Sequence, residues 1–357
     1  MSDWFTVRSR LRDYRINFVD DFVESLRRET ESSFFIVDEG VLDLYGRRLK
    51  PVLPVDRIVP VRATEQHKTL DHCQSLLMTL VQANIRRNAT VVAIGGGIIQ
   101  DISAFIASIL FRGIDWTFYP TTLLAQADSC VGSKSSLNVG QYKNLVGTFY
   151  PPSKIFIDVN FLHTLPVDEI RSGVGEILHF YFVDGSCKAR TLMDQYDAVI
   201  RTPVLLADHI RACLEIKKKM VEIDEFDHNE RNLFNYGHTF GHAIETISDY
   251  SVRHGQAVTL GMDIANYVSL EMGYLDRETF LSMREMLVRN MPDFSLDPAQ
   301  LDRYFKALAK DKKNLDNNLT CILTSGPGCM RKVRLPFDEK LKEAIASYFR
   351  AQPVAKL

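Results

Sequence analysis

Short apolar runs alternate with helical patterns along the first half of the chain. Apolar residues at three- and four-residue spacing predict helices over 70–85 and 101–110. Between such segments lie five runs with the length and composition of buried strands: 34–37, 58–61, 90–94, 116–119 and 154–157. Alternation of strands and helices predicts a parallel sheet with helices on its faces.

The pattern changes near residue 164, after which helical spacing dominates the chain. The predicted helices are 169–182, 203–222, 238–247, 257–272, 278–290 and 338–349. A chain of 357 residues also exceeds one typical core. We therefore predict an α/β domain with a parallel sheet over residues 1–160 and an all-α domain over residues 161–357.

Composition narrows the classes of partner. A net charge of −2 gives no basic field for nucleic acid, and the longest apolar segment, 102–111, is too short to span a bilayer. The first ten residues carry charges where a secretory signal needs an apolar run. Six widely spaced cysteines favour free buried thiols in a reducing compartment. The composition predicts a cytoplasmic protein with no nucleic-acid or membrane partner.

A glycine turn follows one predicted strand. The strand at 90–94 runs directly into Gly95, Gly96 and Gly97, and a helix comes next. Such a turn lets the backbone approach a diphosphate, which the helix N-terminus attracts, but a tight structural turn has the same sequence. The G-x-G-x-x-G spacing is absent. Asp38, after the first predicted strand, suits either a ribose hydroxyl or a helix cap.

Polar and cationic residues gather in the middle of the chain. Residues 120–128 include Thr121, Thr122 and Asp128, and they precede Lys134 and the pair Lys143–Asn144. Lysines among small residues suit a loop folded over an anion, but solvated surface lysines give the same pattern. The same two interpretations apply to a further set of cations: Arg112, Lys217, Arg231, Lys312 and Lys313.

The chain also concentrates histidines. His238 and His242 are four residues apart, which places them on one face of a helix, and His254 follows nearby. Glu176 lies among small and apolar residues, where a carboxylate is costly unless it is paired or binds a metal. Imidazole and carboxylate are common zinc ligands, so these residues indicate a metal site. Satisfied core histidines are the alternative.

In order and spacing, these segments resemble the family of 3-dehydroquinate synthase and related sugar phosphate cyclases. The resemblance extends from about residue 34 to 315. The matching segments are G-G-G-I-I-Q-D (95–101), R-G-I (112–114), P-T-T-L-L-A-Q-A-D-S-C-V-G-S-K (120–134), K-N-L-V-G-T-F-Y-P-P (143–152), G-E-I-L-H (175–179), N-Y-G-H-T-F-G-H-A-I-E (235–245) and H-G-Q-A-V (254–258).

The resemblance implies an NAD-binding α/β domain and a helical domain that binds Zn²⁺ or Co²⁺. It assigns the metal ligands as Glu176, His238 and His254. The residues implied to contact NAD are Asp38, Glu65, Lys68, Gly95, Gly96, Gly97, Asp101, Thr121, Thr122, Asp128 and Lys143.

The remaining family positions concern a sugar phosphate substrate. His242 is implied to help hold the phosphate, and Arg112 to reach the phosphate across a homodimer interface. Lys217 and Arg231 match readers of a substrate carboxylate. The other implied catalytic or substrate-binding residues are Lys134, Asn144, His179, Asn235, and Lys312 or Lys313.

Several departures from the family pattern surround the substrate positions. His179 replaces the usual lysine, Gln256 replaces a glutamate, and 139–141 lacks the usual His-Pro. Lys134 lies between serines instead of glycine and threonine. The resemblance implies conversion of 3-deoxy-arabino-heptulosonate 7-phosphate to 3-dehydroquinate, a step of the shikimate pathway.

The departures favour an alternative, a cyclase for another keto-sugar phosphate in a secondary-metabolite or polysaccharide cyclitol pathway. An NAD- and metal-dependent polyol dehydrogenase and a non-catalytic scaffold are further alternatives.

Overall fold

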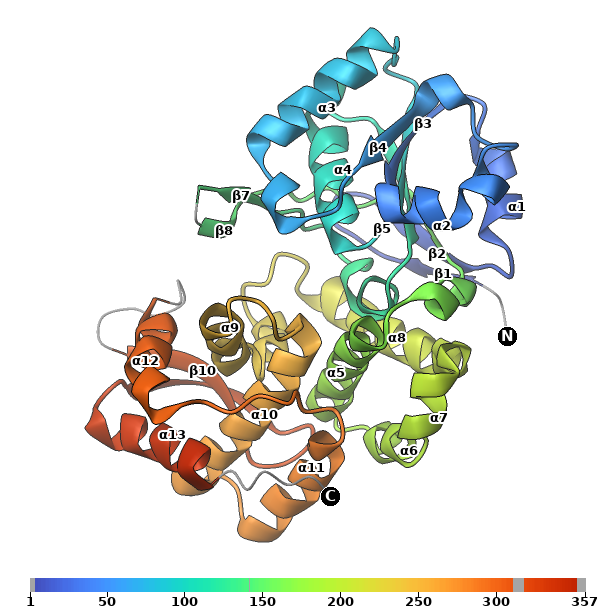
Figure 1. Ribbon diagram of the computed structural model, residues 1–357. Helices are drawn as coiled ribbons and strands as arrows, with labels where there is room; N and C mark the ends of the chain where they lie inside the picture. Colours follow the sequence, from blue (N-terminus) through green and yellow to red (C-terminus); the bar gives the residue numbers. More distant parts are fainter. Residues whose placement is uncertain (1–3, 141, 311–317, 352–357) are drawn as a thin grey trace. The chain divides into compact units, whose positions relative to one another are not determined.

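A computed structural model describes residues 4–140, 142–310 and 318–351. Contacts divide the chain into two compact units, coloured along the sequence in Figure 1. The first unit contains residues 1–166 with 202–226, and the second contains 167–201 with 227–357. Sequence patterning assigned segment 202–226 to the helical domain, whereas its contacts lie within the first unit.

The first unit is built on a seven-stranded sheet with the order β1-β2-β9-β6-β5-β3-β4. All neighbouring strands run parallel except the edge pair β1–β2. The strands are β1 (Trp4–Val7), β2 (Tyr14–Phe18), β3 (Ser33–Asp38), β4 (Ile58–Val61), β5 (Thr90–Gly95), β6 (Asp115–Pro120) and β9 (Lys154–Ile157). The five predicted strands and the parallel sheet are confirmed, and β1 and β2 extend the sheet at one edge.

Helices and a small hairpin complete the first unit: α1 (Phe22–Leu26), α2 (Glu39–Leu49), α3 (Leu70–Gln82), α4 (Gly97–Ile109), α8 (Ala207–Ile223), β7 (Leu137–Val139) and β8 (Tyr142–Val146). Helix α3 ends before the predicted residue 85, because Asn84 takes a left-handed conformation with φ 61°. Helix α4 begins four residues earlier than predicted, directly at the glycine turn.

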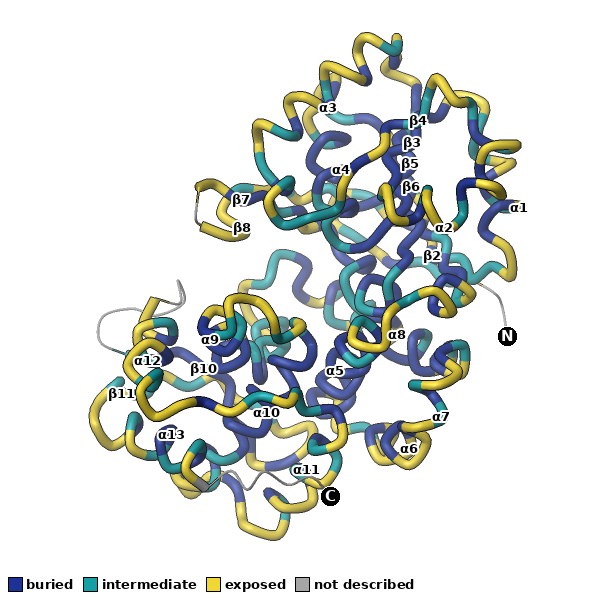
Figure 2. Tube along the Cα trace, in the orientation of Figure 1, coloured by how far each residue is buried: buried dark blue, intermediate teal, exposed yellow. Residues whose placement is uncertain are grey.

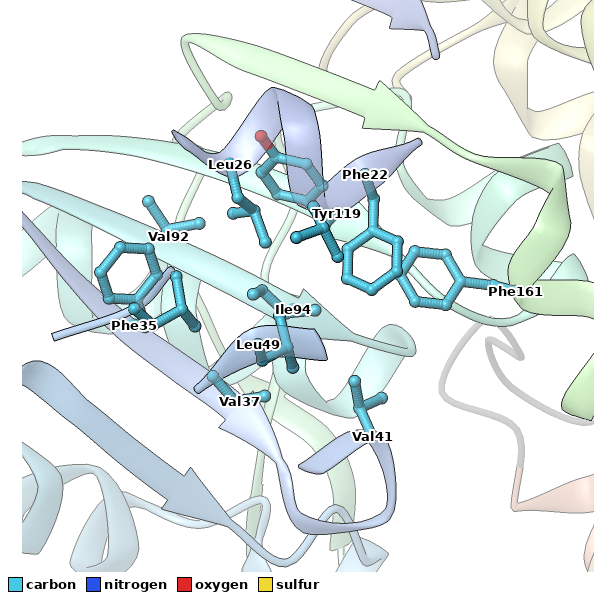
Figure 3. Packing of buried hydrophobic residues seen from close by; sticks show 12 residues of the cluster. Phe22, Leu26, Phe35, Val37, Val41, Leu49, Val92, Ile94, Tyr119 and Phe161 are labelled. Carbon is cyan, nitrogen blue, oxygen red and sulfur yellow. The ribbon is translucent and has the colours of Figure 1, made fainter. Parts of the chain in front are cut away.

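An aromatic and aliphatic core fixes this sheet. Figure 3 shows Phe22 against Phe161, with ring centroids 4.3 Å apart, and Phe35 beside Val92. Phe35 and Ile94 are fully buried. Burial of side chains of this size stabilises a fold by about 1.5–3 kcal/mol each. The core therefore holds β3 and β5 rigidly, and both strands end at candidate binding residues.

The second unit is helical, as predicted: α5 (Val167–Asp184), α6 (Lys188–Asp194), α7 (Tyr196–Arg201), α9 (His238–Ile247), α10 (His254–Glu271), α11 (Arg277–Val288), α12 (Leu301–Ala309) and α13 (Glu339–Ala351). It also contains an antiparallel pair that patterning did not predict, β10 (Asn318–Thr324) and β11 (Met330–Pro336). Helix α10 is buried along most of its length, as its dark blue trace in Figure 2 shows.

Glycines allow α10 to approach its neighbours closely. A Cβ atom on Gly255 would collide with the carbonyl oxygen of Ser172 in α5, and one on Gly175 would collide with the Gly255 carbonyl oxygen. On the other side, a Cβ on Gly241 in α9 would lie 2.9 Å from the Ala257 oxygen. Backbone-to-backbone contact of this kind excludes every larger residue at these positions.

All six cysteines lie among the described residues and are free, with Cys187 and Cys329 exposed and the other four buried. Within the described residues, no helix combines the length and the apolarity needed to cross a bilayer.

We expect Gly255→Ala to destabilise the second unit by about 1–3 kcal/mol, because the added methyl group forces α5 and α10 apart. Gly46→Ala in α2 is the matched control. A Cβ at Gly46 meets nothing within 4 Å, so this change should stabilise the first unit by about 0.5–1 kcal/mol. Urea unfolding of both variants measures the difference; equal effects would contradict the packing argument.

Candidate active site

Three helices of the second unit bring one carboxylate and two imidazoles together. Glu176 lies in α5, while His238 and His254 are the first residues of α9 and α10. Glu176 Oε1 is 3.7 Å from His238 Nε2 and 3.3 Å from His254 Nε2. One ligand atom from each residue lies within 4.8 Å of the others. This arrangement can hold a divalent ion with three protein ligands, as a catalytic zinc site does.

Both imidazoles are oriented through their second nitrogen. His238 Nδ1 lies 3.1 Å from the Tyr236 carbonyl oxygen, and His254 Nδ1 lies 3.2 Å from Glu245 Oε2. With a proton on Nδ1 donated to these acceptors, Nε2 of each ring is the atom that faces Glu176. Gly237 makes the first contact possible, because its left-handed φ of 76° turns the chain sharply into α9. Such outer acceptors are typical of metal-binding histidines.

The electrostatics of the cluster fit a cation. Burial raises the pKa of Glu176, but His238, His254 and His179 outweigh it and hold the pKa well below its usual range. Burial lowers the pKa of His254, whereas Glu245 and Glu176 raise it well above the ordinary value. Glu176 is 2% exposed, and its Oε1 accepts no hydrogen bond from the residues that the structure describes. A buried oxygen of this kind needs a positive partner, and a divalent ion supplies one.

The other two candidate histidines lie beside this cluster. The ring of His242, one turn after His238 in α9, is 5.5 Å from the His238 ring and 5.7 Å from the His254 ring. His242 is exposed. His179 is buried, with Nδ1 3.6 Å from Glu176 Oε2 and its ring 5.7 Å from the Phe234 ring. His242 is thus accessible from solution, whereas His179 is buried beside Glu176.

In the first unit, the glycine turn lies between β5 and α4. Gly96 is the N-cap residue of α4, and no side chain of the described residues caps this helix N-terminus. A Cβ on Gly95 would collide with Ile99, and one on Gly96 would lie 3.0 Å from Thr122 Cγ2. The Thr121 amide donates to the Gly95 carbonyl oxygen over 3.0 Å. The turn thus brings Thr121 and Thr122 beside an uncapped helix N-terminus, which attracts anions.

Asp38 ends β3 and caps α2, because its Oδ1 accepts a hydrogen bond from the Gly40 amide over 2.9 Å. Burial raises the pKa of Asp38. The helix-capping interpretation is therefore correct for Oδ1, and it fixes the carboxylate at the carboxyl end of the sheet.

A second polar network joins α4 to the β7–β8 hairpin. Lys68 Nζ donates to Asp101 Oδ2 over 3.0 Å and to Asn144 Oδ1 over 2.6 Å. The Ser136 amide donates to the other Asp101 oxygen over 2.9 Å. Burial raises the pKa of Asp101 although Lys68 opposes the shift. Because Asn144 has φ 53°, these bonds also stabilise a left-handed backbone.

Glu65 extends this network. It begins the short helix η3 (Glu65–His67), and its Oε1 accepts from Asn138 Nδ2 over 2.9 Å and lies 4.0 Å from Lys143 Nζ. Burial raises the pKa of Glu65, but Asn138, Lys68 and Lys143 lower it overall. Lys143 and Lys134 are both exposed.

Lys217 in α8 is held by Asp128 in the π-helical turn η5 (Ala125–Ser129). Its Nζ lies 2.6 Å from both the Oδ1 and the carbonyl oxygen of Asp128. The Lys217 side chain is 12% exposed. The family resemblance implies separate roles for Asp128 and Lys217, and the fold pairs their side chains.

The remaining candidates fall in three places. Arg112 is exposed on a turn where Phe111 and Arg112 both have positive φ, 51° and 68°. Arg231 and Asn235 lie in η8 (Glu230–Asn235), directly before α9, where Asn235 Nδ2 donates to the Asn232 carbonyl oxygen over 3.0 Å. Lys312 and Lys313 lie outside the described residues.

Family profiles match most of the chain. The profile of the 3-dehydroquinate synthase N-terminal domain matches residues 58–172, and that of the 3-dehydroquinate synthase C-terminal domain matches residues 173–314. The chain belongs to the 3-dehydroquinate synthase family. The resemblance seen in the sequence motifs is thereby confirmed.

Relatives and solved structures agree with this membership. The 3-dehydroquinate synthase of Alkaliphilus metalliredigens is 35% identical over 309 residues, 85% of this chain and 86% of that protein. The 3-dehydroquinate synthase of a Thermoanaerobacter species is 33% identical over 95% of this chain and 99% of its own length. A 2-deoxy-scyllo-inosose synthase complexed with carbaglucose-6-phosphate, NAD⁺ and Co²⁺ superimposes with a TM-score of 0.87 at 25% identity, over 96% of this chain and 99% of that one.

Among the family's motifs, sequence reasoning missed one contributor to the cluster, Glu245. Glu245 lies seven residues after His238 and three after His242, so all three share a face of α9. That spacing alone could have identified Glu245 as a residue on the same helix face as the two histidines. The Tyr236 carbonyl oxygen, by contrast, has no sequence signature, because any residue supplies a backbone acceptor.

We expect Lys68→Met to destabilise the first unit by about 3 kcal/mol, because the change leaves the Asp101 carboxylate, which is only 19% exposed, without its cation. Asp101 has a raised pKa in the fold. The penalty should therefore shrink as pH falls and Asp101 takes up a proton. Urea unfolding between neutral and acid pH measures it.

Two comparisons control this experiment. The double variant with Asp101→Asn should recover about 1–2 kcal/mol of the loss. Arg27→Met, at the exposed pair Arg27–Glu24, should cost under about 1 kcal/mol at every pH. A Lys68→Met penalty that is independent of pH would argue against a buried ion pair.

Proposed function

We propose that this chain is an NAD- and metal-dependent cyclase that converts 3-deoxy-arabino-heptulosonate 7-phosphate into 3-dehydroquinate and releases phosphate. The observation that carries the proposal is the cluster of Glu176, His238 and His254, whose imidazole nitrogens converge on one buried carboxylate oxygen. Membership of the family, with both of its domains matched, supports the same activity.

Glu176, His238 and His254 are the proposed ligands of Zn²⁺ or Co²⁺. A divalent ion with three protein ligands supplies a Lewis acid with coordination positions open to a substrate. The chain's own contribution is orientation: the Tyr236 carbonyl oxygen and Glu245 fix the two rings, and the α5 backbone fixes Glu176. The donor set suits zinc-like ions because it combines imidazole with carboxylate.

NAD is the second proposed cofactor, and it supplies hydride exchange when bound. The proposal is supported by the uncapped α4 N-terminus at Gly96 and by the carboxylate of Asp38 at the neighbouring strand end. The 2-deoxy-scyllo-inosose synthase with a similar fold was solved with NAD⁺ and Co²⁺. The proposed contacts in this chain are Asp38, Glu65, Lys68, Gly95, Gly96, Gly97, Asp101, Thr121, Thr122, Asp128 and Lys143.

Substrate recognition is proposed for polar groups of both units. An exposed His242 beside the metal ligands suits a phosphate oxygen, which it can meet as a hydrogen-bond donor. Lys217 and Arg231 are each proposed as readers of a substrate carboxylate, and Lys217 would then share its charge between Asp128 and the ligand. The other proposed substrate residues are Lys134, Asn144, His179, Asn235, Lys312 and Lys313.

A different sugar phosphate is the second candidate substrate. The structural relative complexed with carbaglucose-6-phosphate favours it, because that ligand is a hexose phosphate analogue without a carboxylate. His179 adds to this argument, since a buried imidazole among aromatic rings replaces the family's lysine. A polyol dehydrogenase would instead accumulate NADH, whereas a cyclase returns the hydride to its own intermediate.

The proposed setting is a cytoplasmic homodimer acting in the shikimate pathway. Arg112 supports the dimer, because it stands exposed on a left-handed turn next to Phe111, an apolar side chain that is 39% exposed. The free cysteines fit a reducing compartment.

Phosphate release from a panel of substrates tests the function. The full-length protein with Co²⁺ and NAD⁺ should release phosphate from 3-deoxy-arabino-heptulosonate 7-phosphate with no net absorbance change at about 340 nm, because NADH is reoxidised within the cycle. Release only from glucose 6-phosphate would transfer the assignment to a hexose phosphate cyclase. Steady NADH production from a polyol would contradict both assignments.

Metal dependence is the control for that assay. Treatment with a chelator should abolish phosphate release, and added Co²⁺ should restore it in the wild-type protein. Glu176→Gln should stay inactive after the same addition, because the amide lacks the anionic oxygen that faces both imidazoles.

A further inference from the structure

Glu245 is the one carboxylate of α9 that faces the cluster, yet it is not among the proposed ligands. It lies near the end of the helix, and its side chain is 15% exposed. Its Oε2 lies 3.2 Å from His254 Nδ1. On the opposite side of the same ring, His254 Nε2 lies 3.3 Å from Glu176 Oε1. One imidazole is therefore flanked by two carboxylates.

This arrangement fixes how His254 can act. A neutral imidazole has one N–H donor and one lone pair. Glu245 Oε2 can only accept, so it draws the proton to Nδ1 and leaves the lone pair on Nε2. Because this nitrogen faces Glu176 Oε1, it holds a cation there: a proton in the metal-free protein, and a metal ion once the ion displaces that proton. Glu245 thus prepares His254 to be a metal ligand through Nε2.

His238 and His254 differ in the acceptor that their Nδ1 atoms meet. His238 Nδ1 meets the neutral Tyr236 carbonyl oxygen over 3.1 Å, while His254 Nδ1 meets an anionic carboxylate. A charged acceptor makes the stronger hydrogen bond and increases the electron donation of the ring. The bond to His254 also joins the last turn of α9 to the first residue of α10, so it constrains the ring position as well as the tautomer.

We propose that Glu245 is a positioning residue of the metal centre, which holds His254 in the Nδ1-protonated form and aims its Nε2 at the ion. The inference rests on the proposed metal site. It predicts that Glu245 sets metal affinity and the ligand field of the bound ion without contacting the ion itself.

A competing arrangement uses the same side chain. His242, Glu245 and His254 also place one ligand atom each within 4.8 Å of one another. In that arrangement, Glu245 would bind a second ion directly, and wild-type protein would bind two ions per chain. The stoichiometry of binding separates the two arrangements.

The test measures Co²⁺ binding to full-length wild type, Glu245→Gln and Glu245→Ala by competition with a chromophoric chelator. We expect one ion per chain in all three. Glu245→Ala should weaken binding about 10–100-fold and shift the visible Co²⁺ bands, because the ring loses its outer acceptor. The affinity of Glu245→Gln should lie between those of the wild type and Glu245→Ala, since its amide oxygen can still accept a hydrogen bond from His254 Nδ1 but carries no charge.

Glu285→Gln is the matched control. Glu285 is an α11 carboxylate that is 70% exposed, and its loss should leave affinity and spectrum unchanged. Thermal unfolding of the proteins, after a chelator has removed the metal, checks that each variant is folded. If Glu245→Ala does not fold, Glu245→Gln still tests the proposal.

Three outcomes would overturn the inference in distinguishable ways. Wild-type affinity and spectrum in both Glu245 variants would remove the positioning role but leave the proposed function intact. Two ions in the wild type and one in Glu245→Ala would make Glu245 a direct ligand. No Co²⁺ binding by the wild type would overturn the metal site, and with it the proposed function.

Discussion

Close contact between three helix backbones is the constraint on which the candidate site depends. Each proposed ligand is next in sequence to a glycine that lies where α10 contacts a neighbouring helix. These glycines are Gly175 before Glu176, Gly237 before His238, and Gly255 after His254. A Cβ at any of these glycines would meet backbone atoms of the facing helix. Because metal–ligand bonds are only about 2 Å long, side chains starting from more widely spaced helices would not converge on one ion. The glycines therefore determine the metal geometry before any ligand is considered.

The candidate binding residues of the first unit have hydrogen-bond partners within that unit. Lys68 binds Asp101, Lys217 binds Asp128, and Asp38 caps α2. Asp101 and Asp128 are thereby each paired with a lysine inside the unit, whereas Asp38 accepts a backbone hydrogen bond. Partners of this kind reduce the entropy lost when a ligand binds, at the cost of competing with the ligand for the same atoms. The proposed metal cluster differs, since its carboxylate oxygen faces two imidazole nitrogens and has no hydrogen-bond donor within the described part of the chain.

The sequence predicted five strands of the parallel sheet as apolar runs and missed β1, β2, β10 and β11. Strands β3 and β5 are continuous apolar runs, which identify them without ambiguity. Strand β11, Met-Arg-Lys-Val-Arg-Leu-Pro, exposes alternate cations, and β1 lies at a sheet edge, so neither has a strong apolar run. For the site, helical spacing alone joined His238 to His242, whereas the fold joins His238 to His254. Only the helix crossing, which depends on contacts distant in sequence, decides between those two pairs.

Charge explains why the proposed site needs cations beyond its metal. A divalent ion bound by Glu176, with Glu245 behind His254, gives a centre whose formal charges sum to zero. Such a centre can polarise an oxygen but has no net attraction for a phosphate dianion. The chain as a whole, at −2, provides no compensating field. Phosphate affinity must therefore come from individual cations, which accounts for the lysines and arginines dispersed through the family's motifs in both units. His179, at a position where the family pattern has lysine, removes one fixed cation and leaves the three proposed metal ligands in place.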